Sequence, residues 1–375
     1  MAVLFWVAAA MIAYTYVGYP AAVYVASRFR PERAPDEPFE PTVSVVISLY
    51  NEEANVPVKL ESLRALDYPR GLIQIIVGSD GSTDRTNEVL RQQAELHPIT
   101  VMCREERSGK PAMLNTLVPT ATGELLIFTD ARQRLDAGAL RALAKHFGDP
   151  GIGSVSGELL FEDVSGKPVG VGLYWEYEKF IRRSESRLGS MLGATGALYA
   201  IRRELFTPVP PGLVLDDVFI PLKVVEQGYR AIFEPAARIY DRIAGNARAE
   251  FARKSRTLAG NFQLLRHFPW AVNPFSGLVA WQFFSHKVLR LFVPYSLLAL
   301  LGANLFLLGS AFYRAALAAQ AAFYLCALAG AFTSRPIRVF DVPHMFCVMN
   351  WAAVVGLYRF LAGSQDVVWQ KADNR

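Results

Sequence analysis

Two stretches decide the fold: TVSVVISLYNEE at residues 42–53 and LIQIIVGSDGSTD at residues 72–84. Residues 42–49 and 72–78 form nearly continuous runs of β-branched apolar residues, which are typical of parallel strands buried on both faces. Each run then opens into a polar loop that contains carboxylates. Between them, apolar residues recur at helical spacing, at Val56, Leu60 and Leu63, with Asn55 as the expected cap. The pattern predicts a strand–helix–strand unit whose loops meet at the sheet edge where α/β proteins bind ligands.

The same alternation continues along the chain. Residues 86–96 are expected to form a helix, 99–103 a short strand and 124–128 a buried strand that ends in Thr129-Asp130-Ala131-Arg132. Before that strand, Gly109 allows a tight turn that presents Lys110. Further helices are predicted at 173–188 and from 216 to 227, and strands at 198–202 and 230–234. This order predicts a mostly parallel sheet with helices on both faces.

Composition indicates a membrane protein. Charged residues make up 19% of the 375 residues, and the apolar residues gather at the two ends of the chain. The net charge of +5 suits a membrane-apposed protein that handles anionic substrates, whereas no basic run interleaved with aromatics suggests nucleic-acid binding. Three cysteines without a paired spacing suggest neither a disulfide framework nor a zinc site.

The apolar ends predict the topology. Residues 2–27 contain no charged side chain and are long enough to cross a ~30 Å hydrocarbon core. Arg28, Arg30 and Arg33 follow, so the positive-inside rule places the middle of the chain in the cytosol. Near the other end, residues 268–284 suggest interfacial helices, and residues 291–313 and 315–334 suggest two membrane crossings. Residues 345–363 either cross the membrane or lie in the interface, and the interface is favoured. The predicted divisions are a transmembrane helix at 1–27, a linker at 28–41, a cytosolic domain at 42–266, membrane helices at 267–363 and a tail at 364–375.

Four motifs together resemble a known family. They are Tyr50-Asn51-Glu52, Ser79-Asp80-Gly81-Ser82, Gly109-Lys110-Pro111 followed by Asn115, and Asp130-Ala131-Arg132, three of them directly after predicted strands. In this order they resemble the family two inverting glycosyltransferases of the glycosyltransferase A-type fold. The flanking apolar segments look like those of bacterial membrane synthases of polysaccharides and glycolipids. The resemblance implies an α/β fold with a mostly parallel Rossmann-like sheet, flanked by transmembrane and interfacial helices.

The resemblance also implies the donor site. Nucleotide-binding roles fall on Tyr50, Glu52, Asp80, Lys110, Asp130, Arg253 and Arg256. Asp130 matches the first carboxylate of the family's DxD motif, which holds Mg²⁺ or Mn²⁺ on the pyrophosphate. Arg132 stands where the second carboxylate is expected. Two interpretations stay open: Asp130 and the pyrophosphate hold the metal with water, or Arg132 supplies part of the positive charge.

The acceptor side is implied by Leu215-Asp216-Asp217-Val218. This matches the family's acidic pair, with Asp217 as the catalytic base and Asp216 as its orienting neighbour, although the reverse order remains an alternative. The small residues at 193–197 either let an acceptor approach the backbone or simply pack tightly. The run at 253–257 aligns with the family's QxxRW element, but Arg253 and Thr257 stand where the Gln and the Trp are expected. Alternatively, this run is a basic stripe that contacts anionic lipid. Trp369 and Arg375 resemble a tail element found in related synthases.

These features predict an inverting glycosyltransferase in the bacterial inner membrane. It would move a sugar from a nucleotide diphosphate sugar, UDP-linked, to a glycan or lipid acceptor in extracellular polysaccharide or envelope glycan synthesis. The expected partners include membrane lipids and subunits of an export or synthesis complex, but no nucleic acid. One alternative is a polyprenyl-phosphate or ceramide-like lipid glycosyltransferase. Another, from a different class, is a non-catalytic membrane sensor that binds nucleotide sugars.

Overall fold

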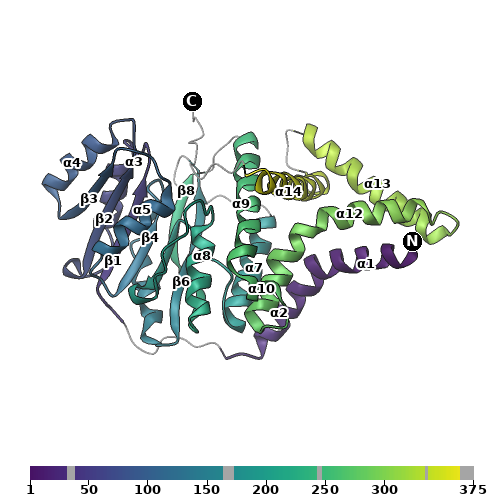
Figure 1. Ribbon diagram of the computed structural model, residues 1–375, viewed down its shortest axis with the longest axis horizontal. Helices are drawn as coiled ribbons and strands as arrows, with labels where there is room; N and C mark the ends of the chain where they lie inside the picture. The colour runs from purple at the N-terminus through teal and green to yellow at the C-terminus, as the bar shows by residue number, and fades with distance from the viewer. Residues whose placement is uncertain (32–38, 164–172, 243–246, 334–336, 364–375) are drawn as a thin grey trace. The chain divides into compact units, whose positions relative to one another are not determined.

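The computed structural model describes residues 1–31, 39–163, 173–242, 247–333 and 337–363. It divides into two compact units, one built from residues 27–245 and the other from residues 1–26 and 246–365. The first is the α/β unit and the second is helical (Figure 1). The predicted tail residues Trp369 and Arg375 lie outside the described part of the chain.

The α/β unit is built on one eight-stranded sheet of order β3-β2-β1-β4-β7-β6-β8-β5. Its strands are β1 Val43–Leu49, β2 Ile73–Asp80, β3 Ile99–Arg104, β4 Leu125–Thr129, β5 Arg134–Leu135, β6 Ile152–Glu162, β7 Leu198–Arg202 and β8 Arg230–Arg242. Neighbours pair in parallel from β3 to β4 and between β6 and β8, whereas β7 is antiparallel to both β4 and β6, and β5 is antiparallel to β8. Figure 1 shows β3, β2, β1 and β4 side by side. The predicted α/β class and mostly parallel sheet are confirmed.

Helices cover the sheet and supply the residues that face its edge. They are α3 Asn55–Arg64, α4 Thr86–Leu96, α5 Lys110–Leu117, α6 Ala139–Ala144, α7 Leu173–Leu188 and α8 Asp216–Glu226. The predicted cap Asn55 was wrong: Asn55 is the first helical residue, Ala54 precedes it, and the Asn55 amide donates to the Glu52 carboxylate. The side chain therefore ties the loop to the helix and does not cap the helix backbone.

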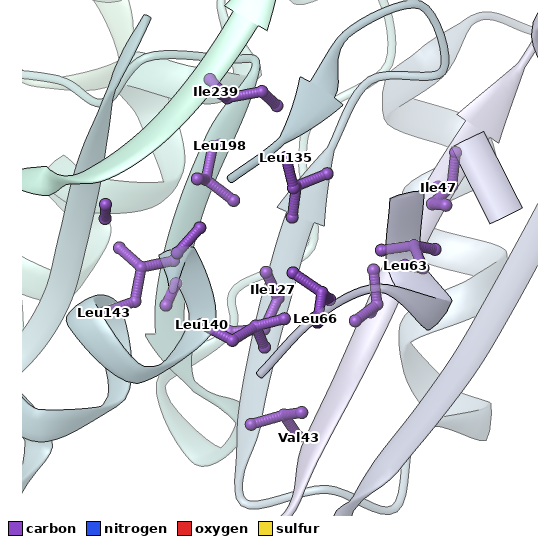
Figure 2. Close-up of a cluster of buried hydrophobic side chains, with 14 of the residues drawn as sticks. Val43, Ile47, Leu63, Leu66, Ile127, Leu135, Leu140, Leu143, Leu198 and Ile239 are labelled. Atoms are coloured by element: carbon purple, nitrogen blue, oxygen red, sulfur yellow. The ribbon is translucent and has the colours of Figure 1, made fainter. Parts of the chain in front are cut away.

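An apolar core fills the space between one face of the sheet and helices α3, α4 and α6 (Figure 2). It brings together Val43 and Ile47 of β1, Leu63 of α3, and Leu140 and Leu143 of α6. Truncating a fully buried leucine of this kind to alanine costs about 2–5 kcal/mol of stability. The core therefore fixes β1, α3 and α6 rigidly behind the loops at the sheet edge.

Among its described residues, the helical unit has four helices that are long and apolar enough to cross a membrane: Ala2–Arg28, Leu278–Leu305, Ala311–Phe332 and Arg338–Leu361. The first consists of α1 Ala2–Ala13, a π-helical turn at Tyr14–Gly18 and α2 Tyr19–Arg28. The others are α11 Leu278–Phe283, a π-helical turn at Phe284–Val288 and α12 Leu289–Leu305, then α13 Ala311–Phe332 and α14 Arg338–Leu361. Two further helices, α9 Ala247–His267 and α10 Pro269–Val272, lie in the chain between the first apolar helix and the other three.

Two predicted boundaries in this unit differ from the structure. The turn between the second and third apolar helices falls at residues 306–310 and not at Arg314, because Arg314 lies in the first turn of α13 and donates to the Leu308 carbonyl at 2.8 Å. The predicted cytosolic domain at 42–266 also included most of α9, whereas α9 packs on α14 within the helical unit. The reason is close packing: a Cβ at Gly356 would lie 2.9 Å from the backbone nitrogen of Ala259.

Candidate active site

The loops that follow β1 and β2 are tied together by side-chain to backbone hydrogen bonds. Asn51 adopts a positive φ of 53°, which asparagine tolerates better than most residues. Its Oδ1 accepts from the Thr83 amide at 2.8 Å, and its own amide donates to Ser82 Oγ at 3.1 Å. The Glu52 amide donates to Thr86 Oγ1 at 2.8 Å. These bonds hold the two loops that carry Tyr50, Glu52 and Asp80 at one edge of the sheet.

Asp80, at the end of β2, is only 3% exposed and holds the loop before Lys110. Its Oδ1 accepts from the amide and the hydroxyl of Ser108, both at 2.9 Å, and its Oδ2 accepts from the Gly109 amide at 2.6 Å. Gly109 has a φ of +90°, so the turn depends on glycine. The residues before it include Arg107, whose guanidinium lies 3.3 Å from the centroid of the Tyr50 ring. Asp80 therefore fixes the loop that joins Tyr50 to Lys110.

Lys110 brings together carboxylates from two other elements. Its Nζ lies 2.8 Å from Asp130 Oδ1, just after β4, and 3.4 Å from Asp216 Oδ2, at the start of α8. Burial lowers the pKa of Lys110, but the Asp130 and Asp216 carboxylates outweigh it and raise this pKa well above its ordinary value. The lysine is therefore a permanent cation between the predicted metal residue and the predicted acidic pair.

The acidic pair Asp216-Asp217 opens α8, where the helix dipole favours negative charge. Asp216 is buried, and its Oδ2 makes no hydrogen bond to any described residue. The Asp217 carbonyl accepts from the Ala194 amide at 2.8 Å. A Cβ on Gly196 would lie 2.9 Å from Asp217 Oδ2, and one on Gly193 would lie 2.9 Å from Val218. Of the two interpretations left open for residues 193–197, this geometry favours tight packing, here against the start of α8.

The loop from Thr129 to Gln133 is held from two sides. Arg132 donates to Asp241 Oδ2 of β8 at 2.5 Å, and Gln133 Nε2 donates to the same oxygen at 3.1 Å. From α3, the Lys59 ammonium donates to Thr129 Oγ1 at 2.7 Å and to the Gln133 carbonyl at 3.0 Å. Burial lowers the pKa of Lys59 to about 7, opposed by the nearby Asp130.

Three residues near the site were not predicted from sequence. Lys59 was missed because lysine is almost never fully buried, although its spacing from Val56 and Leu63 places it on the buried face of the helix. Tyr199 of β7 is fully buried, and its hydroxyl has no hydrogen-bond partner within the described ranges. Burial raises the pKa of Tyr199 strongly, and Asp216 and Asp217 add to this. Arg182 of α7 donates to Thr195 Oγ1 at 2.6 Å. No motif in the sequence marked these positions.

The residues present fit a divalent cation only when a substrate supplies further ligands. In the part of the chain that the structure describes, no group of three or more His, Cys, Asp or Glu side chains could hold a metal ion. The Asp130 side chain is 38% exposed and can therefore reach a bound ligand. The buried Oδ2 of Asp216 has no hydrogen-bond partner among the described residues. Mg²⁺ commonly binds through one or two carboxylates together with substrate phosphates and water. This donor set therefore suits a cation that arrives with a pyrophosphate.

Two of the predicted nucleotide residues lie in the other unit. Arg253 and Arg256 are on α9, with Arg253 exposed and Arg256 half-buried. The structure therefore brings together Lys110, Asp130 and Asp216 within the α/β unit, whereas the roles of the two arginines stay predictions.

Comparisons with known proteins agree with this fold. The model of the family described as "Glycosyl transferase family 2" matches residues 44–208. The chain is 24% identical over 234 residues to poly-β-1,6-N-acetyl-D-glucosamine synthase of Staphylococcus aureus (strain COL), covering 60% of this chain and 56% of that protein. It is 25% identical over 217 residues to an N-acetylglucosaminyltransferase of Azorhizobium caulinodans, covering 53% and 54%. The matched part thus spans about half the length of these relatives.

A solved structure resembles the chain over most of its length. The mannosyltransferase PcManGT from Pyrobaculum calidifontis, in complex with GDP-Man and Mn²⁺, superposes with a TM-score of 0.73. The sequences are 26% identical, and the match covers 96% of this chain and 99% of that one. Residues 44–208 therefore form a glycosyl transferase family 2 domain on a glycosyltransferase A-type sheet, in a chain whose described residues include four helices long and apolar enough to cross a membrane.

Proposed function

We propose that the protein is an inverting glycosyltransferase that moves a sugar from a nucleoside diphosphate sugar to a hydroxyl group of a membrane-associated glycan or lipid. The observation that supports it best is Lys110, which lies 2.8 Å from Asp130 and 3.4 Å from Asp216. Lys110 is the first residue of α5, Asp130 directly follows β4, and Asp216 is the first residue of α8. These groups lie at the carboxyl edge of the sheet, where α/β proteins bind ligands. The cation suits a diphosphate leaving group, and a neighbouring carboxylate suits the acceptance of a proton.

The donor side uses the loops after β1 and β2. Tyr50, Glu52 and Asp80 would take the base and ribose, and Arg107, stacked on the Tyr50 ring, would carry positive charge beside them. Arg253 and Arg256 would bind the pyrophosphate, because a guanidinium pairs with two phosphate oxygens at once. Asp80 would also hold the loop at Ser108 and Gly109, where its carboxylate accepts three hydrogen bonds.

The leaving group must depart with negative charge. A divalent cation held by Asp130 together with pyrophosphate oxygens and water would neutralise that charge without proton transfer. The 2.5 Å pairing of Arg132 with Asp241 supports this interpretation over one in which Arg132 replaces the metal. Lys110, as a permanent cation next to Asp130, would add to the stabilisation of the departing diphosphate.

Asp217 would act as the base. Its carboxylate takes the proton of the acceptor hydroxyl while that oxygen attacks C1 of the sugar from the side opposite the phosphate. The bond from C1 to the phosphate oxygen breaks, and its electron pair leaves with the nucleoside diphosphate. Because Asp216 is buried and paired with Lys110, it suits the part of positioning neighbour. This supports Asp217 as the base against the reverse order.

The membrane arrangement that we propose places the α/β unit in the cytosol and α14 in the interface. α14 packs along α9, whose Arg253, Lys254 and Arg256 do not suit the hydrocarbon core. The contact is close, since Gly356 approaches the backbone of Ala259, and Phe360 stacks on Phe262 at 5.8 Å. Figure 1 draws α14 foreshortened, whereas α1 and α12 run across the view. A helix that packs along a charged helix fits the membrane surface better than a span.

The donor and acceptor are proposed by class. The names of the two curated relatives concern N-acetylglucosamine, and the structural neighbour was solved with GDP-Man. We therefore propose a UDP-linked sugar as the donor and GDP-mannose as the competing candidate. Extracellular polysaccharide or envelope glycan synthesis at a bacterial inner membrane, with partner subunits for export, would be the setting.

The test measures release of free nucleoside diphosphate by the purified full chain in detergent. UDP-N-acetylglucosamine, UDP-glucose and GDP-mannose are offered with and without a chelator, together with membrane extract as the source of acceptor. We expect release with one donor, loss of release in chelator, and a product whose mass has increased by one or more sugars. A chain that binds one of these donors and releases nothing would instead be the non-catalytic sensor.

A further inference from the structure

Lys59 is a buried lysine that the proposed mechanism does not use. It lies on α3, is 2% exposed, and points its ammonium at Thr129 Oγ1 and the Gln133 carbonyl, 2.7 Å and 3.0 Å away. Thr129 is the last residue of β4, and Gln133 directly precedes β5. One ammonium group thus ties together the two ends of the three-residue segment that carries Asp130.

The same helix anchors the segment a second time. Ser62, one turn further along α3, accepts a hydrogen bond at its Oγ from the Leu135 amide at 3.0 Å. On the other side, Asp241 holds the side chains of Arg132 and Gln133. The backbone around Asp130 is therefore fixed by α3, whereas the side chains that follow it are fixed by β8.

A buried lysine at this position lowers the stability of the fold. Its neighbours on the buried face of α3, Val56, Leu60 and Leu63, are apolar and belong to the core. Burying an ammonium group away from water costs several kcal/mol unless hydrogen bonds and charges compensate. An apolar residue would avoid that cost but could not bond to both ends of the segment. Compared with an apolar residue at position 59, the lysine therefore contributes the hydrogen bonds to Thr129 and Gln133.

We propose that Lys59 is a positioning residue that holds the Asp130 segment in the conformation that takes a divalent cation bound to a nucleoside diphosphate. The inference rests on the proposed function, because it assumes that Asp130 meets the metal. Lys59 acts through Thr129 and Gln133 and touches neither the cation nor the sugar. Groups that hold a metal ligand in place in this way typically change metal affinity 10- to 100-fold when removed.

The experiment measures Mn²⁺ binding, and not turnover. The full chain in detergent is titrated with Mn²⁺ in the presence of saturating UDP, and separately GDP, and bound Mn²⁺ is followed by electron paramagnetic resonance. Lys59→Met keeps the length of the side chain and removes the donor group, so affinity for Mn²⁺ should fall by about 10- to 100-fold. Thr129→Val removes one of the two acceptors and should weaken binding in the same direction, by less.

The double variant separates positioning from general damage. Lys59→Met and Thr129→Val remove the two ends of one hydrogen bond, so their effects on Mn²⁺ affinity should combine to less than the product of the single effects. Tyr68→Phe is the matched control. It removes another buried hydrogen bond of the same unit, from the Tyr68 hydroxyl to the Pro41 carbonyl at 2.6 Å, and should lower stability without changing Mn²⁺ affinity.

Each outcome supports or overturns the positioning role of Lys59. If wild type binds Mn²⁺ with nucleotide and Lys59→Met binds it within twofold, Lys59 has no positioning role. If Tyr68→Phe weakens binding as much as Lys59→Met does, the effect is general destabilisation and the inference fails. If Lys59→Met does not fold, the decision passes to Thr129→Val, and unchanged affinity there overturns the inference. Wild type that binds no Mn²⁺ with either nucleotide overturns the metal role of Asp130 itself, and with it this inference.

Discussion

Replacing Gly196 by alanine tests whether close packing places Asp217. The added Cβ would lie 2.9 Å from Asp217 Oδ2 and 3.4 Å from its Cβ and Cγ. An ordinary van der Waals contact begins at 3.4 Å, so the carboxylate oxygen must retreat by 3.4 − 2.9 = 0.5 Å. Misplacing a reacting group by about 1 Å can cost about 10²-fold in rate, so half that displacement corresponds to a roughly 10-fold loss in kcat.

The assay for Gly196→Ala is nucleoside diphosphate release at saturating donor, beside a titration of nucleotide binding. Nucleotide affinity should stay unchanged, because Asp80 and Lys110 lie on other elements from Gly196. Gly71→Ala is the control, since a Cβ there meets nothing within 4 Å. The reasoning is refuted if folded Gly196→Ala turns over at the wild-type rate, or if it loses nucleotide binding as strongly as it loses transfer.

Three further predictions follow from the site, the topology and the buried lysine. Asp130→Ala should abolish transfer, as should chelator on the wild type; full activity in chelator would contradict the metal role. Protease added outside intact cells should spare residues 30–266, and cleavage there would reverse the proposed orientation. Because burial lowers the pKa of Lys59 from 10.5 to about 7, the folded chain binds fewer protons than the unfolded chain between these values. The free energy of unfolding should therefore rise with pH across that window, by about 1.4 kcal/mol per pH unit from this group. Unfolding in detergent, measured from pH 7 to 9, should show a steeper rise for wild type than for Lys59→Met. Equal slopes for the two proteins would contradict the prediction.

The parallel half of the sheet was predictable because its strands are continuous apolar runs. β1 and β2 begin and end within two residues of the prediction, and the antiparallel strand β7 also has its predicted bounds. β6 was missed because its sequence, IGSVSGELLFE, is rich in small and polar residues and has no apolar run longer than three residues. Its side chains are small because neighbours press on it: a Cβ on Gly157 would lie 2.4 Å from the Ala237 carbonyl oxygen. Such a strand is specified by its partners and not by its own pattern.

The motifs located the carboxylates but not what surrounds them. Asp130, Asp216 and Lys110 were chosen from three separate stretches, and the structure brings them together. The sequence could not show that Arg132 is held by Asp241, since 108 residues separate the two and only the pairing of β5 with β8 brings them close. Asn115 is a similar case: it belongs to the motif, yet its side chain bonds twice to the backbone of Val209, at 2.8 Å each. Residues that support a site through long-range contacts leave no local signal.

The most direct test of the account is Asp217→Asn, measured for transfer and for nucleotide binding in the same preparation. Asparagine keeps the shape of the side chain and its hydrogen-bonding capacity but removes the basic oxygen. The account predicts that transfer falls by about 10²- to 10⁴-fold, as expected for a lost general base, while nucleotide affinity stays within twofold of the wild type. Asp216→Asn should cost less, because it only positions its neighbour. Transfer by Asp217→Asn at a near wild-type rate, or a loss of nucleotide binding as large as that of Asp80→Ala, would contradict the proposed mechanism.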